Sequence, residues 1–169
     1  LPATSYQAAI EVGPNYFDAY IHMGMLAENW DNHNAVSYYN SAIEIEPNNI
    51  EGYRNKGLFY HFRSEYINAR KSFKKIINID SNFEETYFNI GNTYLGQYDQ
   101  INNNDFLDSA FFYFKKANDL NQYYVQAIHN IGLCYEIKKD FEMAKSYYKK
   151  AIEIDNNYNP SLNALNSLY

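Results

Sequence analysis

Cysteine, basic residues and long apolar runs are scarce or missing in this sequence, and each absence excludes a class of protein. The 169 residues include a single cysteine, Cys134, which excludes an internal disulfide framework. Lys and Arg number 14 against 20 Asp and Glu, so the net charge of −6 lacks the basic footprint of a nucleic-acid-binding protein. No apolar run approaches the roughly 18 residues that a membrane-spanning helix needs, so we expect no transmembrane segment in this chain.

Motifs for catalysis and for cofactor binding are missing as well. None of the four histidines pairs with another His or Cys at ligand spacing on one helix face. The Asn-rich and Asp-rich stretch 99–108 departs from a calcium loop, because Ile101 occupies a ligand position and no glycine follows. Phosphate loops, nucleophile elbows and His-Glu-x-x-His helices do not occur. We therefore predict that the chain is not an enzyme and uses no cofactor or metal.

One glycine, in contrast, recurs at a nearly constant spacing. It stands at Gly24, Gly57, Gly91 and Gly132, at intervals of 33, 34 and 41 residues. A small residue, alanine, follows each glycine in the second half of its unit, at Ala35, Ala69, Ala110 and Ala144. A fixed period of this size indicates an array of structural repeats.

Each unit contains two segments whose apolar residues lie three and four positions apart, which predicts two amphipathic helices, A and B. In the first full unit we expect helix A near residues 17–29 and helix B near 34–46. The glycine in helix A costs about 1 kcal/mol of helix propensity relative to alanine. We interpret it, together with the alanine of helix B, as the place where the two helices approach most closely.

The order aromatic, apolar-Gly, Tyr, Ala, aromatic and Pro resembles the tetratricopeptide repeat over essentially the whole chain. The resemblance implies an all-α solenoid of antiparallel helix pairs stacked into a right-handed superhelix, forming a single domain over 1–169. The implied parts are a partial repeat (helix B) at 1–14, repeats at 15–47, 48–81, 82–122 and 123–156, and a capping or truncated helix at 157–169. The seven extra residues of the third repeat are expected to form a loop at about 97–105, with Asp105 as the cap of the next helix.

The same resemblance implies a function, because helices A of this family line a concave face. Two residues before each glycine stand His22, Asn55, Asn89 and Asn130, which would form a polar ladder able to hydrogen-bond a peptide backbone. The full set of candidate peptide-binding residues is His22, Met25, Asn55, Leu58, Phe62, Phe88, Asn89, Asn92, His129, Asn130 and Leu133. Asn is also common at this position in the generic repeat and throughout this chain, so a purely structural ladder is the alternative.

The expected function is a protein–protein interaction scaffold that holds a peptide segment or a partner protein in the concave groove. The alternatives are a self-assembling structural spacer, a homo-oligomer included, and a non-catalytic accessory domain of a larger protein. The basic clamp with which some family members hold chaperone tails is not matched in this chain, so binding through that clamp is not expected.

The Asn-rich and Tyr-rich units and the stretch Gly-Leu-Cys-Tyr-Glu at 132–136 are similar to bacterial tetratricopeptide proteins that are exported as lipoproteins. This resemblance implies the periplasmic side of a bacterial cell envelope, with a lipid anchor in the full-length protein; a cytoplasmic location is the alternative. Because the sequence begins at Leu1, we expect a processed or excised piece of a longer protein.

Overall fold

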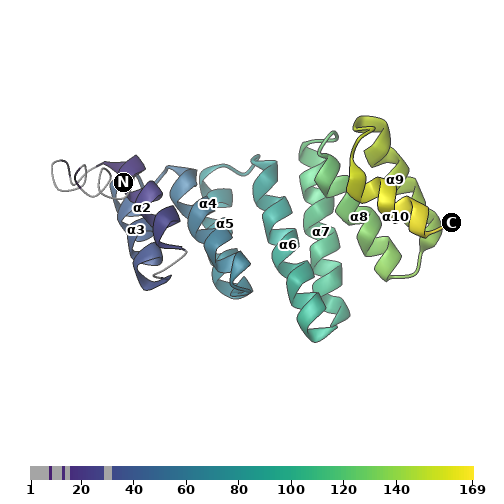
Figure 1. Cartoon of the computed structure of the whole chain (residues 1–169), viewed down its shortest axis with the longest axis horizontal. Coiled ribbons are helices and arrows are strands. Elements are labelled where there is room, and N and C mark those ends of the chain that lie inside the picture. The colour runs from purple at the N-terminus through teal and green to yellow at the C-terminus, as the bar shows by residue number, and fades with distance from the viewer. Residues whose placement is uncertain (1–7, 9–12, 14–15, 29–31) are drawn as a thin grey trace. The chain divides into compact units, whose positions relative to one another are not determined.

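The computed structural model describes the chain apart from residues 1–7, 9–12, 14–15 and 29–31 (Figure 1). The described residues form helices and connecting turns, with no strand among them. The chain divides into two compact units, Leu1–Ser81 and Asn82–Tyr169. The predicted all-α fold is confirmed. The partial repeat expected at 1–14 lies almost wholly outside the described residues.

The first unit contains two antiparallel helix pairs. Its helices are α2 (Phe17–Ala27), α3 (Asn32–Ile45), α4 (Ile50–Phe62) and α5 (Tyr66–Ile79). Helix α2 packs on α3, and α4 packs on α5, while α3 also contacts α4 and so joins the two pairs. A side-chain cap starts α4, because the Asn49 side chain accepts a hydrogen bond of 3.0 Å from the backbone N–H of Glu51.

The second unit contains two further pairs and one terminal helix. Its helices are α6 (Glu84–Ile101), α7 (Asn104–Leu120), α8 (Val125–Ile137), α9 (Phe141–Ile154) and α10 (Asn159–Ser167). Helix α6 packs on α7 and α8 packs on α9, while α7 contacts α8 and α9 contacts α10. Each pair thus places one predicted helix A against its own helix B.

In every pair, the recurring glycine of helix A lies beneath an aromatic ring of helix B. The facing pairs are Gly24 and Tyr39, Gly57 and Phe73, Gly91 and Phe114, and Gly132 and Tyr148. A Cβ atom added at the last three glycines would stand only 2.5, 2.6 and 2.7 Å from the ring. These rings are completely buried, so the space that a side chain would need is already filled. The glycine is therefore required by close packing of the two helices.

Two of the four rings also make a polar contact across their pair. The Tyr39 hydroxyl donates a hydrogen bond of 2.5 Å to Glu28, and the Tyr148 hydroxyl donates one of 2.6 Å to Glu136. Both glutamates stand four residues after their glycine. In the other two pairs the ring is phenylalanine, and that position holds His61 or Leu95, so the glutamate is absent where the hydroxyl is absent.

The predicted loop at 97–105 is wrong, because the insertion lengthens the two helices that flank it. Helices α6 and α7 have 18 and 17 residues, against 13 and 14 in α4 and α5, so each gains about one turn. Only Asn102 and Asn103 lie between them. The cap of α7 is Asn103, whose side chain accepts a hydrogen bond of 2.9 Å from the backbone N–H of Asp105. Asp105 itself, the expected cap, lies within the first turn of the helix.

The added turns are helical because they carry apolar residues at helical spacing. The rings of Tyr94 and Phe106 stack across the pair with their centroids 6.5 Å apart. Tyr98, one turn beyond Tyr94, packs against the same core as the buried Leu107. Added apolar contacts of this kind stabilise two longer helices more than they would an exposed loop.

Replacing Gly91 by alanine tests the glycine–ring contact. Overpacking against Phe114 should cost about 1–3 kcal/mol, of which the better helix propensity of alanine returns up to about 1 kcal/mol. We expect a net loss of stability, measured as a lower denaturant midpoint. The matched control is Gly96→Ala, at a half-exposed position of the same helix, which should not destabilise the protein. A Gly91→Ala variant as stable as the wild type would contradict the packing role of the glycine.

Candidate functional site

In the first unit, the structure leaves several of the predicted residues accessible on helices α2 and α4. Met25 is 42% exposed and Phe62 is 79% exposed, while Leu58 is half-buried one turn before Phe62. His22 is exposed, and its Nδ1 atom lies 2.7 Å from the carbonyl oxygen of Asp18. We call His22, Met25, Leu58 and Phe62 the helix-A surface of the first unit. Its exposed residues are chiefly apolar.

Asn55 does not belong to this surface, in contrast to its predicted place in a polar ladder. Its side chain is only 7% exposed, and its amide N–H donates a hydrogen bond of 2.9 Å to the carbonyl oxygen of Glu51. The amide is therefore engaged with its own helix one turn back. An exposed ladder through the first unit is wrong for this reason.

In the second unit, Asn92 and Asn130 meet across two repeats, and Asn89 lies three residues before Asn92 on α6; we call these three residues the amide cluster. The Asn130 amide of α8 donates a hydrogen bond of 3.0 Å to the Asn92 oxygen of α6, and Asn89 lies at 3.5 Å from Glu85. All three are half-buried. A primary amide has two N–H donors and an oxygen with two lone pairs, so one internal bond does not exhaust it. Leu133, also half-buried, follows Asn130 on α8.

Phe88 is used to pack one repeat against the next within the second unit. Its ring lies 5.8 Å from that of Phe114 in its own repeat and 5.1 Å from that of Tyr124, which precedes α8. Ile21, three residues before its own glycine like Phe88, is buried, whereas Phe88 is half-buried. Phe88 thus contributes to packing between repeats, and its predicted contact with a peptide stays a prediction.

His129 stands at the same position of the fourth repeat and holds α10 in place. Its ring lies 5.2 Å from that of Tyr148 and 5.6 Å from that of Tyr158. Its Nδ1 atom is 3.0 Å from the hydroxyl oxygen of Ser161, which is fully buried on α10. The predicted peptide-binding residue is therefore half-buried and in contact with the C-terminal helix.

The sequence profile of the tetratricopeptide repeat family matches residues 17–49 and 125–158. The chain contains tetratricopeptide repeats. The matched segments hold the α2–α3 and α8–α9 pairs, the two pairs that carry the Tyr–Glu hydrogen bond.

Known proteins and structures extend this similarity. Anaphase-promoting complex subunit 3 of Schizosaccharomyces pombe is 30% identical over 93 residues, which are 54% of this chain and 13% of that protein. This chain therefore spans only 13% of the length of that relative. The C-terminal part of a TPR repeat-containing protein from Cytophaga hutchinsonii matches with a TM-score of 0.77 at 21% identity, over 96% of this chain and 65% of that one.

A second similar structure is the first TPR of Spaghetti (RPAP3), bound to the HSP90 peptide SRMEEVD. It matches with a TM-score of 0.62 at 20% identity, over 70% of this chain and 89% of that one. At such identities the similarity shows the tetratricopeptide fold alone. Tetratricopeptide proteins are generally non-catalytic scaffolds that bind proteins or peptides on extended surfaces.

Metal binding, thiol reactivity and membrane insertion can each be assessed for the described side chains. Within the part of the chain that the structure describes, no group of three or more His, Cys, Asp or Glu could hold a metal ion. Cys134 is fully buried, and burial raises the pKa of its thiol to about 12, so the reactive thiolate is disfavoured. No described helix is both long and apolar enough to cross a membrane.

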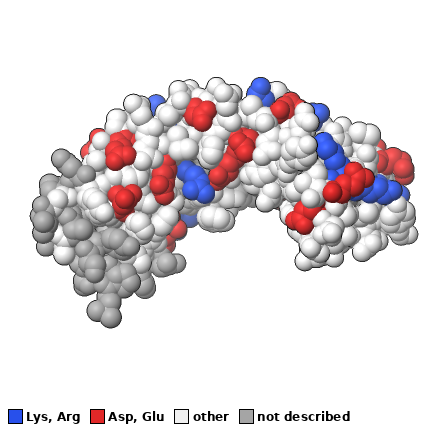
Figure 2. Space-filling view, turned by 90° about the horizontal axis from the view of Figure 1, so that it is seen from above, with Lys and Arg blue, Asp and Glu red and all other residues white. Residues whose placement is uncertain are grey.

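Charged side chains are dispersed over the face of the molecule that Figure 2 shows. On the face shown in Figure 2, acidic residues are scattered and the fewer basic residues lie in small groups, with uncharged surface between them. That distribution suits contact through apolar and neutral polar groups more than through a single charged field.

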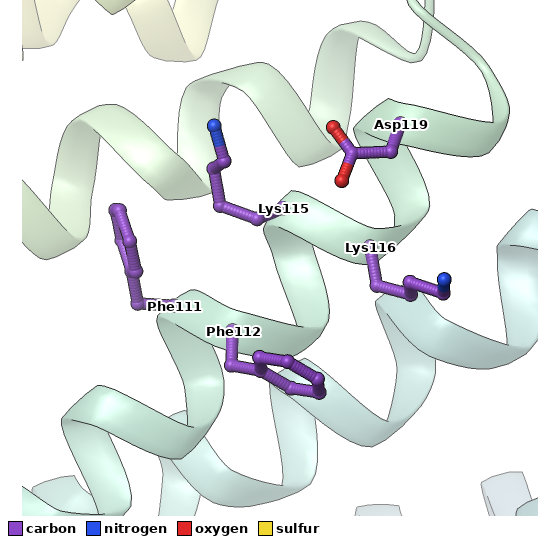
Figure 3. Close-up of a pocket in the computed structure, with 5 residues that line it drawn as sticks. All are labelled: Phe111, Phe112, Lys115, Lys116 and Asp119. Carbon is purple, nitrogen blue, oxygen red and sulfur yellow. The ribbon is translucent and has the colours of Figure 1, made fainter.

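One pocket was not predicted from the sequence. It is open, has a volume of about 300 Å³, and is lined by Phe111, Phe112, Lys115, Lys116 and Asp119, all from α7 (Figure 3). Helix α7 is a helix B, whereas the peptide-binding residues predicted from the sequence all belong to helices A. The signal was present as two adjacent phenylalanines, at positions where α5 carries Arg70 and Lys71.

The burial of His129 generates a test of the contact with α10. Burial lowers the pKa of His129 below the ordinary value of 6.5, although the charge of Glu136 opposes this shift. Below pH 6.5 the unfolded chain therefore binds a proton that the folded chain resists, and stability falls as the pH drops. We expect hydrogen exchange in α10, corrected for intrinsic rates, to become faster as the pH falls from about 7.5 to about 5.5.

The variant His129→Phe should abolish this pH dependence, because it keeps an aromatic ring and removes the titrating group. His61→Phe is the matched control, since burial also lowers the pKa of His61 but that residue lies on α4. Persistence of the pH effect on α10 in His129→Phe would contradict the assignment.

Proposed function

We propose that this chain is a non-catalytic scaffold that binds an extended peptide segment of a partner protein through the helix-A surface of its first unit. The observation that carries the proposal is the exposure of Phe62, with 79% of its side chain accessible beside the half-buried Leu58. Exposed apolar groups that lie together mark interaction surfaces more often than isolated ones do.

The size of the surface side chains supports a substantial contribution to affinity. Burying a phenylalanine side chain releases about 1.5–3 kcal/mol, which corresponds to roughly a tenfold to hundredfold change in affinity. Met25 adds a flexible, polarisable group that adapts to ligands of different shape. A surface of this composition favours sequence-tolerant binding of apolar side chains.

In the second unit, the amide cluster offers a complementary chemistry. Asn89, Asn92 and Asn130 are half-buried rather than covered, and their remaining donors and acceptors match those of a peptide backbone. We infer that these amides bind a main chain independently of its sequence. The peptide seen on the similar Spaghetti structure supports peptide binding by this fold, although the basic clamp for chaperone tails is not matched here.

The proposal is tested with peptides selected from a random library on the whole chain. Their affinities are then measured by fluorescence anisotropy for the wild type and for Phe62→Ser. We expect binding to the variant to weaken about tenfold or more, since the ring can no longer be buried against the ligand.

Ile67→Ser is the matched control, because Ile67 is 60% exposed in the same unit but lies on α5, a helix B. This variant should bind the selected peptides like the wild type. The proposal fails if no peptide is enriched, if Phe62→Ser binds normally, or if both variants lose affinity equally. A stable oligomer that hides Phe62 would favour the self-assembling spacer instead.

A further inference from the structure

The pocket on α7 belongs to the second unit and shares no residue with the helix-A surface of the first unit. The adjacent Phe111 and Phe112 occupy positions that are Arg70 and Lys71 in α5 and Lys145 and Ser146 in α9. Phe112 is 61% exposed, and its ring meets that of Tyr113 edge-on at 5.2 Å. The Phe111 position is apolar in α3 as well, where it is Val36, but the Phe112 position is Ser37 in α3 and so is polar in every other helix B. A large exposed ring at a position that is otherwise polar indicates a surface used for contact.

Phe111, which forms one wall of the pocket, is held in place by contacts with Tyr135 and Lys138. The Phe111 ring meets that of Tyr135 on α8 edge-on at 5.2 Å, and the Lys138 ammonium lies 5.1 Å from its centre. Lys138 also forms an ion pair of 2.6 Å with Asp108. Phe111 is thereby fixed between two helices, while Phe112 remains free to meet a ligand.

Two lysines flank these rings. Figure 3 shows Phe111 and Lys115 along one side of α7, Phe112 and Lys116 along the other, and Asp119 on the following turn. Neither Lys115 nor Lys116 forms an ion pair with any residue that the structure describes. Two ammonium groups beside an apolar pocket match a ligand that joins an apolar side chain to carboxylates.

We propose that the α7 pocket is a second docking site, for an acidic peptide segment that carries one aromatic or large aliphatic side chain. The side chain enters between Phe111 and Phe112, and carboxylates on either side of it pair with Lys115 and Lys116. Asp119 repels acidic groups at the end of the pocket nearest the C-terminus of α7 and so sets the direction of the segment. The volume of about 300 Å³ is at the lower end for binding pockets and suits a single large side chain.

The site is tested by nuclear magnetic resonance on the isotope-labelled whole chain, using the acetylated, amidated peptide Glu-Asp-Phe-Glu-Asp as the probe. We expect shifts of the backbone amides over residues 111–119, with a dissociation constant of about 1 mM that rises with added salt. Two further probes separate the contributions, namely Gln-Asn-Phe-Gln-Asn without charge and Glu-Asp-Ala-Glu-Asp without the ring. Both should bind at least several-fold more weakly.

The lysine pair recurs in α9 as Lys149 and Lys150 without the phenylalanines, which supplies a matched control. The double variant Lys115→Gln/Lys116→Gln should lose about tenfold in affinity, and Phe112→Ser should lose at least as much, whereas Lys149→Gln/Lys150→Gln should bind like the wild type. These variants leave Phe62 intact, so the result does not depend on the helix-A surface.

Four outcomes would overturn the proposal. They are the absence of shifts on α7 at millimolar probe, equal binding of the uncharged peptide, equal loss in the α9 control, and occupation of the pocket by a second copy of the chain. The last would appear as concentration-dependent shifts over 111–119 without any peptide, together with a dimer by light scattering.

Discussion

The close contact between a glycine of helix A and an aromatic ring of helix B determines how each helix pair packs. Because protein interiors are filled as densely as organic crystals, a ring that occupies the place of a side chain leaves no room for a Cβ atom. The contact recurs at all four glycines of the repeat, from Gly24 to Gly132. The polar partner of the ring varies, since Tyr39 and Tyr148 carry a glutamate acceptor and the two phenylalanines need none.

Once the pairs are fixed in this way, the remaining side chains divide between packing and exposure. His129 contacts α10, and Phe88 packs against Tyr124 at the start of α8. Phe62 and Phe112, in contrast, are exposed to solvent. Phe112 and Phe114 are only two residues apart on α7, yet the first is largely exposed and the second is fully buried. The two proposed binding surfaces are therefore composed of side chains that the tetratricopeptide packing does not use.

The repeat pattern predicted the helix pairs well, because packing of helix A on helix B repeats with the glycine; the first helix was expected at 17–29 and spans Phe17–Ala27. Register alone could not predict that Asn55 would bond its own backbone, since that depends on side-chain rotamer and burial. The inserted stretch was expected to be a loop because insertions in repeats usually form loops, whereas Tyr98 continues the helical spacing of Tyr94 into it and α6 extends to Ile101. The envelope location stays a prediction.

The division between buried and exposed rings is measured most directly by hydroxyl-radical footprinting of the whole chain, read residue by residue by mass spectrometry. The account predicts rapid oxidation of Phe62 and Phe112 and strong protection of Phe73 and Phe114, the partners of Gly57 and Gly91. Each exposed ring is compared with a buried ring of the same chemistry in its own unit, which removes differences of intrinsic reactivity. Protection of Phe62, or oxidation of Phe114 as fast as that of Phe112, would contradict the account.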